Sequence, residues 1–293
     1  MRSCGSYSSR WRPVAGGGLR GGEPGVGKTR ITEELVREAQ APGCLTLTGH
    51  CYEAAGTPPY IPFVEILERA SKVIPRSAFR EALGDAAPEV ARMMPELRRI
   101  FPDLPPPTEL PPDQQRRFVF NAYGEFAARA SRVMPTVTVY EDLHWTDEPT
   151  VQLLRHLAQQ VGAEPALLVG TCRDVELDVN RPFARELESM LRERRATRIS
   201  LRRLPEGDVA TTLESLGGPD VPAGLARVVF RETEGNPFFV EEVFQHLSEE
   251  CRLFGDEGRW KTDLRIEDLR VPEGVRLVIG RRLERVSDET ARR

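Results

Sequence analysis

The sequence lacks a long apolar segment. No run of apolar residues approaches the roughly 20 that a membrane-spanning helix needs. The opening MRSCGSYSSRWRP also has no apolar core of the kind found in signal peptides. These absences argue against a membrane protein and against secretion. We therefore predict a cytoplasmic protein that does not engage membranes.

The chain is also short of net charge and of cysteine pairs. Its 41 basic and 45 acidic residues leave a formal charge of -4, so the whole-chain charge gives no reason to expect binding to nucleic acid or to a membrane surface. The five cysteines are odd in number and contain no CxxC pair, which argues against a disulfide framework or a structural zinc site. Cys44, His50 and Cys51 match no common metal-site spacing, and reduced thiols around a strand are the preferred interpretation.

What the chain does contain is an alternation of strand-like and helix-like segments over residues 21–204. Ile31, Leu35 and Ala39 mark one face of a helix, and a long helix is expected from roughly Gln114 to Arg132. The strand-like segments are CLTLTG, TVTVYEDLHW, ALLVGTCRD and TRISLRRL. This alternation predicts an α/β fold with a mostly parallel sheet and helices on both faces. Residues 205–262 are predicted to be helical and to end in a hairpin around the GDEG turn.

A phosphate-loop motif lies near the start of the first helix. Its residues are Gly22, Glu23, Pro24, Gly25, Val26, Gly27, Lys28 and Thr29, which fit the pattern GxxxxGK[ST]. Such glycines let backbone N–H groups surround phosphate oxygens, and the following helix adds its positive end. Lys28 would reach the β- and γ-phosphates of ATP, and Thr29 would offer its hydroxyl to Mg²⁺. The alternative is an ordinary glycine turn before a helix.

The stretch before this motif is unusual for a buried strand. PVAGGGLRG contains three consecutive glycines, and glycine weakens strands. We therefore expect residues 1–20 to be irregular, with 1–13 disordered and 14–20 forming at best a frayed strand.

Two acidic residues follow an apolar strand. Glu141 and Asp142 close the run TVTVYED, where carboxylates could serve a magnesium ion beside the phosphates. One would hold the Mg²⁺ shell and the other would polarise the attacking water, and the spacing leaves open which does which. A solvated acidic strand end is the alternative. Asp147 is either a third acid or a helix N-cap, and His144 and Trp145 are expected to pack beneath the acidic turn.

Six blocks of sequence resemble a known family. In chain order they are GEPGVGKTR, GHCYE…GTPPYIPFVEIL, VYEDLHWTDEPTVQLLRHL, LLVGTCRDVEL, TEGNPFFVEEV and VPEGVRLVIGRRLERVS. Together, over about residues 22–293, they resemble the AAA-type signalling ATPases of the STAND class, often labelled Orc1-like AAA ATPase domains. Such domains occur in large LuxR-type transcriptional regulators and in proteins fused to adenylate cyclase or kinase domains.

The resemblance implies further roles. Arg173, in GTCRD, falls where such proteins place a sensor arginine that reaches the γ-phosphate; a surface arginine is the alternative. Pro237, in GNP, matches the proline of the family's GxP element, which packs near adenine and links the base to a helical lid, here residues 205–262; a helix stop is the alternative. Residues 263–293 would begin a winged-helix region that is truncated, so a fragment of a larger protein is expected.

Three functions follow, in order of preference. The first is an ATP-driven switch with slow hydrolysis, in which ATP, ADP and Mg²⁺ are the ligands and protein partners or self-association act through C-terminal regions. The second is a nucleotide-inert interaction module with the same fold. The third is an initiator-like DNA-binding ATPase. For the third, the arginines of LRERRATRISLRR are accompanied by acids in the flanking helix, so a solvated face is preferred and direct nucleic-acid binding is not expected.

Overall fold

The computed structural model describes residues 16–41, 43–53, 58–160, 164–173, 182–250, 252–254 and 260–261. The chain forms two compact units. The first contains residues up to 21 together with residues 29–200, and the second contains residues 22–28 together with residues from 201 onward. Residues 22–28 of the phosphate-loop motif therefore group with the C-terminal helices, whereas Thr29 belongs to the first unit. The division after Ser200 lies four residues before the predicted boundary at 204.

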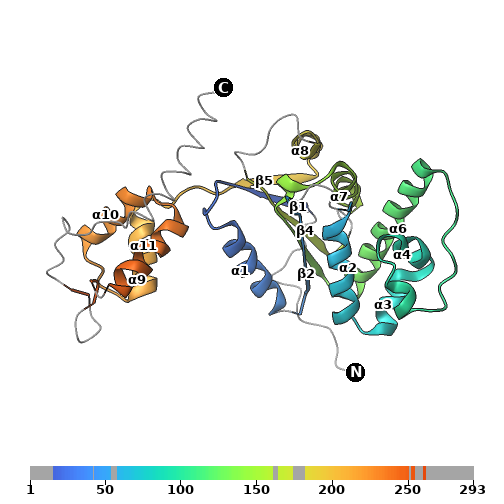
Figure 1. Cartoon of the computed structure of the whole chain (residues 1–293), viewed down its shortest axis with the longest axis horizontal. Coiled ribbons are helices and arrows are strands. Elements are labelled where there is room, and N and C mark those ends of the chain that lie inside the picture. Colours follow the sequence, from blue (N-terminus) through green and yellow to red (C-terminus); the bar gives the residue numbers. More distant parts are fainter. Residues whose placement is uncertain are drawn as a thin grey trace. The chain divides into compact units, whose positions relative to one another are not determined.

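A five-stranded parallel sheet forms the centre of the first unit (Figure 1). Its strand order is β2-β3-β4-β1-β5, and every described pair of neighbours runs parallel. The strands are β1 (Gly16–Gly21), β2 (Leu45–His50), β3 (Thr136–Glu141), β4 (Ala166–Thr171) and β5 (Ala196–Ser200). The predicted α/β class with a parallel sheet is confirmed.

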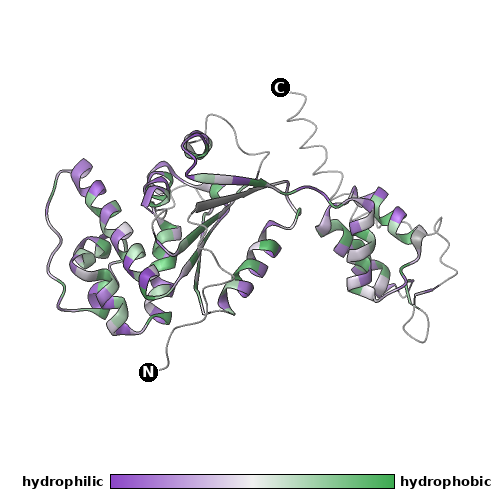
Figure 2. Ribbon diagram, turned by 180° about the vertical axis from the view of Figure 1, so that it is seen from behind, coloured by the Kyte–Doolittle hydropathy of each residue, from purple (hydrophilic) through white to green (hydrophobic). Residues whose placement is uncertain are grey.

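Helices cover both faces of this sheet, with α1 on one side and α2 and α7 on the other in Figure 1. They are α1 (Lys28–Gln40), α2 (Ile61–Val73), α6 (Pro112–Val133), α7 (Glu148–Gln160) and α8 (Pro182–Arg192). Side chains of successive strand residues point to opposite faces, so Val137 and Val139 pack with Ala39 of α1, whereas Tyr140 joins the larger core around Phe63 of α2. Purple and green residues on different sides of the helices in Figure 2 show the same amphipathic pattern.

A helical insertion separates α2 from α6. It contains α3 (Arg76–Leu83), the 3-10 turn Gly84–Ala86, α4 (Ala87–Met93) and α5 (Leu97–Ile100). Phe79 of α3 meets Phe126 of α6 edge to face, with 5.5 Å between the ring centroids. The insertion therefore extends the core of the first unit, and the long helix predicted from Gln114 to Arg132 is α6.

The glycine-rich stretch before the phosphate loop differs from expectation. Residues 16–21 form β1, which pairs with β4 on one side and β5 on the other, so the prediction of an irregular stretch up to residue 20 is wrong for residues 16–20. Every residue except proline carries a backbone donor and an acceptor, glycine included, and two parallel neighbours can pair with these groups without any contribution from side chains. Residues 1–13, predicted to be disordered, lie outside the described residues.

The second unit carries its own helical core. Its helices are α9 (Glu206–Gly217), α10 (Ala223–Thr233) and α11 (Pro237–Glu249). Val209, Val229 and Val240 are buried between them. An antiparallel bridge joins Phe254 to Trp260 where the hairpin was predicted. The GDEG turn and the predicted winged-helix region, 263–293, lie outside the described residues.

Two expectations from the sequence concern the described helices and cysteines: that the chain does not span a membrane, and that its cysteines are reduced thiols. None of the helices that the structure describes is long and apolar enough to cross a membrane. Cys44 and Cys51 are free thiols, and burial raises the pKa of the Cys51 thiol to about 12. Burial therefore favours the protonated, neutral form of the Cys51 thiol.

Candidate functional site

The phosphate loop runs from the end of β1 to the start of α1. The backbone N–H of Val26 donates to the Glu23 carbonyl at 3.4 Å, which closes a tight turn. Gly25 and Gly27 have φ values of 81° and 93°, a left-handed backbone conformation that residues other than glycine rarely adopt. Because α1 begins at Lys28, its first N–H groups have no acceptors within the helix and present partial positive charge.

The ammonium group of Lys28 lies against the loop that precedes it. Its Nζ donates to the carbonyl oxygens of Gly22, at 2.9 Å, and Glu23, at 2.8 Å. These two bonds fold the side chain back over the loop and bring its charge among the loop residues. Contact between Lys28 and the β- and γ-phosphates stays a prediction from the motif.

Thr29 and Glu141 are both adjacent to a buried threonine of α1. The Thr32 hydroxyl lies 2.7 Å from the Thr29 carbonyl oxygen and 3.4 Å from Oε1 of Glu141, and it can donate to one of them at a time. Thr29 itself is exposed on the first turn of the helix. Thr32 was not singled out from the sequence, although a threonine on the apolar face of α1, in step with Leu35 and Ala39, was a visible signal.

Glu141 points to the α1 side of the sheet. It follows Val137 and Val139 at intervals of two along β3, and these valines pack on that same side. Burial raises the pKa of Glu141, and the neighbouring Asp142 carboxylate adds to the effect, while His50 and the Thr32 hydroxyl act in the opposite direction. The side chain is therefore a partly desolvated carboxylate.

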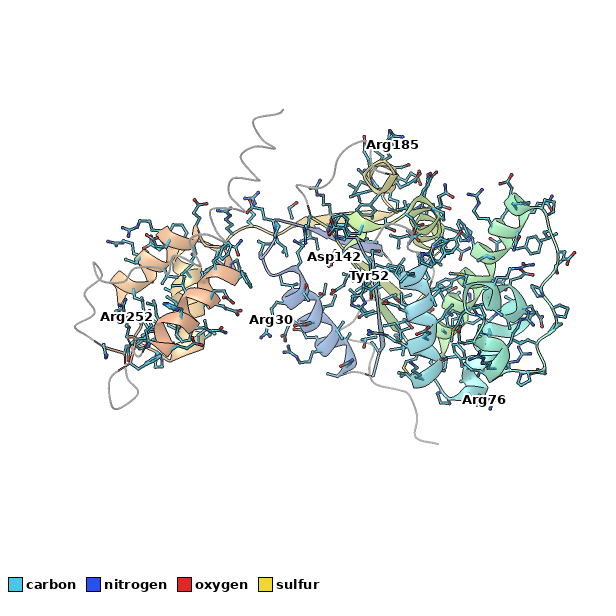
Figure 3. All side chains as sticks on the ribbon, in the orientation of Figure 1. Arg30, Tyr52, Arg76, Asp142, Arg185 and Arg252 are labelled. Carbon is cyan, nitrogen blue, oxygen red and sulfur yellow. The ribbon has the colours of Figure 1, made fainter. Side chains whose placement is uncertain are left out.

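Asp142 leaves the strand in another direction. Its backbone is left-handed, with φ 56° and ψ 44°, and its N–H donates to the hydroxyl of Thr171 on β4 at 3.0 Å. Its carboxylate is about half exposed and lies 3.8 Å from Nδ1 of buried His144. Figure 3 labels Asp142 at the end of the sheet. The two adjacent acids thus have different surroundings, as groups with different roles often do.

A second glutamate, Glu65 of α2, contacts the end of β2, the strand that pairs with the end of β3. His50 ends β2 and is the register partner of Glu141. Glu65 of α2 lies 2.8 Å from Nδ1 of His50 and accepts a hydrogen bond from the Tyr52 hydroxyl at 2.7 Å. Burial alone would raise the pKa of Glu65, but the hydrogen bonds from Tyr52 and His50 hold that pKa below its usual value.

Arg173 lies two residues beyond β4, the strand that pairs with both β3 and β1. Because the strands are parallel, Arg173 leaves the sheet at the same edge as Asp142, whose N–H bonds to Thr171 at the end of β4. Its side chain is partly exposed. The structure therefore places Arg173 at the edge where the predicted acids emerge.

Pro237 is the first residue of α11, in the unit that also holds the phosphate loop. Asn236 caps this helix, accepting the Phe238 N–H at 3.2 Å. The Asn236 side chain also donates from Nδ2 to the Pro24 carbonyl at 3.1 Å, and the Phe238 N–H reaches the Gly25 carbonyl at 3.2 Å. The GNP element therefore starts a helix and at the same time contacts the loop. These contacts were not foreseen from the sequence.

The acidic turn after β3 also contains residues with structural roles. Asp147 caps α7, because its two carboxylate oxygens accept from the N–H and the hydroxyl of Thr150, each at 2.8 Å. This observation favours the N-cap interpretation. His144 is buried and stacks at a tilt on Trp145, with 4.8 Å between the ring centroids, as the packing interpretation expected.

The groups present suit a magnesium nucleotide. A loop with left-handed glycines, an ammonium group folded over it and a helix N-terminus supply the donors that a polyphosphate requires. A Cβ added to Gly27 would meet no atom within 4 Å, so the loop is open at that residue. Hydroxyl and carboxylate oxygens from Thr29, Glu141 and Asp142 are the hard ligands that Mg²⁺ prefers.

Comparison with known proteins places the chain in a family. No curated protein sequence gives a significant match. Among solved structures, it is similar to the signal transduction ATPase with numerous domains (STAND) protein with a tetratricopeptide repeat sensor from Pyrococcus horikoshii, at 14% identity and a TM-score of 0.40. That alignment covers 81% of this chain but 30% of the archaeal one, so the chain spans under a third of that protein's length.

An AAA ATPase domain model matches residues 19–169, just over half of the chain, and such domains use nucleotide, usually with Mg²⁺. The chain belongs to the AAA ATPase domain family.

Proposed function

We propose that this chain is the ATP-binding, slowly hydrolysing switch domain of a STAND-type bacterial signalling or transcriptional regulator. The observation that carries the proposal is the ammonium group of Lys28, folded over a left-handed glycine loop at the start of α1. Family membership supports nucleotide use. The grouping of the loop with helices α9 to α11 supports a switch, because a ligand that orders the loop acts on residues in contact with those helices.

Each predicted site residue receives one role in this proposal. Lys28 and the loop amides hold the β- and γ-phosphates, and Pro237 borders the adenine. Thr29 and Glu141 serve the Mg²⁺ side, because both adjoin the Thr32 hydroxyl. Asp142, whose carboxylate is about half exposed, orients the attacking water, and Arg173 contacts the γ-phosphate. Mg²⁺, when bound, supplies positive charge that offsets the charge of the phosphate oxygens.

Hydrolysis is proposed to be slow. A switch requires an ATP state that persists long enough to act on a partner, and hydrolysis then resets it. We propose that the domain works in the cytoplasm and acts on protein partners or on further copies of itself. Direct binding to nucleic acid is not part of the proposal.

Calorimetric titration of Mg-ATP tests the proposal. Lys28→Ala removes one charged phosphate contact, which costs on the order of 2 to 3 kcal/mol and lowers affinity about 100-fold. Lys72→Ala, which removes an exposed lysine from α2, is the matched control and should leave affinity unchanged. Equal affinity in the Lys28 variant and the wild type would remove the loop from the mechanism. A wild-type protein that binds no Mg-ATP would favour the nucleotide-inert module.

A further inference from the structure

Arg203 and the start of α11, both in the second unit, contact three consecutive residues of the phosphate loop. The Arg203 guanidinium donates twice to Oε2 of Glu23, at 2.9 and 2.8 Å, and also pairs with Glu234. Asn236 then bonds to the carbonyl of Pro24, and the Phe238 N–H reaches the carbonyl of Gly25. The loop is thus fastened at each residue from Glu23 to Gly25.

Asn236 is the central member of this set. Its side chain is 4% exposed and uses both ends of the amide, with Oδ1 accepting from Phe238 N–H and Nδ2 donating to Pro24. A Cβ placed on Gly25 would lie 2.8 Å from this Oδ1, so the close approach requires glycine. The amide is therefore fixed between the start of α11 and the loop.

Fixing a carbonyl also fixes the N–H of the same peptide group. A trans peptide is planar, and its C=O and N–H point in opposite directions. The bond from Asn236 to the Pro24 carbonyl therefore sets the direction of the Gly25 N–H, which points away from Asn236. In the next peptide, the Gly25 carbonyl accepts from Phe238 while the Val26 N–H donates to Glu23, which completes the turn.

We propose that Asn236 is a positioning residue for nucleotide binding. It holds the Pro24–Gly25 peptide in the orientation that presents the Gly25 N–H to a phosphate, and it makes this orientation depend on the start of α11. The inference rests on the proposed function for its ligand, but the assigned role concerns the shape of the loop in the protein without nucleotide. Because coupling between two sites is reciprocal, nucleotide binding also stabilises the start of α11.

The variant Asn236→Ser distinguishes the hydrogen bond to the Pro24 carbonyl from the hydrogen bond that caps α11. Serine caps helices about as well as asparagine, but its hydroxyl is too short to cap α11 and reach Pro24 together. We expect about fivefold weaker Mg-ATP binding, the loss that one net hydrogen bond produces. We also expect faster hydrogen exchange at the Val26 and Phe238 amides without nucleotide, while the interior of α11 keeps its protection. Asn121→Ser, the same change at an exposed residue of α6, is the matched control and should change neither quantity.

Asn236→Ala removes the cap as well. It should weaken Mg-ATP binding to the same extent as Asn236→Ser and, unlike that variant, should also lower the protection of the first turn of α11. The proposal is overturned if Asn236→Ser leaves the exchange of the loop amides at the wild-type rate, or leaves Mg-ATP affinity within twofold of wild type. If the wild type itself binds no Mg-ATP, the proposed function fails, while loop exchange in the serine variant still decides whether Asn236 orders the loop.

Discussion

Strands β1 and β3 hold equivalent interior positions in one sheet but are stabilised differently. Each pairs with a parallel neighbour on both sides, and each ends in residues assigned to the site. In β3, five of six residues are buried, so its side chains fix it between two helical layers. β1 reads GGGLRG, so four of its six residues are glycines, and its backbone pairs with β4 on one side and β5 on the other. Side-chain burial stabilises β3, whereas the backbone pairing of β1 requires no side chain.

This difference extends to the chemistry at the two strand ends. β1 leads to a loop that offers backbone donors and an ammonium group, which suit phosphate oxygens. β3 leads to two carboxylates, which suit a cation and a water molecule. The comparison suggests a division of labour in which the end of β1 binds nucleotide and the end of β3 hydrolyses it. Four predictions test this division, beginning with the largest expected effect.

Replacing both acids should separate turnover from binding. The double variant Glu141→Gln with Asp142→Asn should lower phosphate release at least about 100-fold, a typical loss when acid–base groups are removed. Mg-ATP affinity should stay within about threefold, because Lys28 and the loop amides remain. Asp113→Asn with Glu125→Gln changes two exposed acids of α6 and serves as the control. Phosphate release that survives in the first variant would mean that the activity uses other acids or comes from a contaminant.

A substitution of Arg173 tests the end of β4, the strand that lies between β3 and β1. If its guanidinium contacts only the γ-phosphate, Arg173→Ala should weaken ATP binding about tenfold and leave ADP binding nearly unchanged, since only ATP loses a charged hydrogen bond. Parallel titrations with the two nucleotides give the ratio that matters. Arg185→Ala, at an exposed residue of α8 (Figure 3), is the control. Equal losses for ATP and ADP would assign Arg173 to the fold or to the inner phosphates.

Glu141 and Glu65 should respond oppositely to neutralisation. The pKa of Glu141 is raised, so its contribution to stability is full below the usual carboxyl pKa of 4.5 and is lost as pH rises through the folded-state value. The pKa of Glu65 is lowered, so its contribution is present above 4.5 and is lost as pH falls. Glu141→Gln should therefore raise the thermal midpoint of the nucleotide-free protein at pH 7, and Glu65→Gln should lower it.

The difference for Glu141→Gln should shrink when the melts are repeated near pH 4.5, whereas the difference for Glu65→Gln should shrink only as the pH falls below 4.5. A Glu141→Gln variant that is less stable than wild type at pH 7 would show that the carboxylate is not desolvated at a cost to folding. It would also weaken the case that the end of β3 is organised for chemistry rather than for stability.

The smallest effect concerns the backbone of β1. Because β1 is paired on both sides, the amides of residues 17–20 should exchange as slowly as those of 137–140 in the nucleotide-free protein. Rapid exchange confined to β1 would restore the frayed strand expected from its composition. The loop would then be loosely held, and nucleotide binding would have to order it.

Sequence patterns predicted one strand and not the other for a physical reason. The alternation in TVTVYE and the acids after it predicted β3 and located Glu141 and Asp142, because burial leaves a signature in residue types. Backbone hydrogen bonds leave no such signature, so residues 14–20 were expected to form at best a frayed strand. Helix α6 begins at Pro112, two residues before the predicted start at Gln114, because proline is well tolerated in the first turn of a helix.

The contacts that organise the site were the least predictable part. Thr32 and Glu141 are 109 positions apart, and Asn236 and Pro24 are 212 apart. The motif itself could be recognised because its residues are contiguous. An asparagine before a proline does signal a helix cap, but nothing local indicates that the same amide also reaches the phosphate loop.

The most direct test of the division between the strand ends measures Mg-ATP binding and phosphate release on the same samples. The set comprises the wild type, Lys28→Ala, and the double variant of Glu141 and Asp142. We predict that the wild type binds and slowly hydrolyses ATP, that the Lys28 variant loses both activities, and that the acid variant binds but does not hydrolyse. An acid variant that loses binding as completely as the Lys28 variant, or a Lys28 variant that binds ATP as the wild type does, would contradict the account.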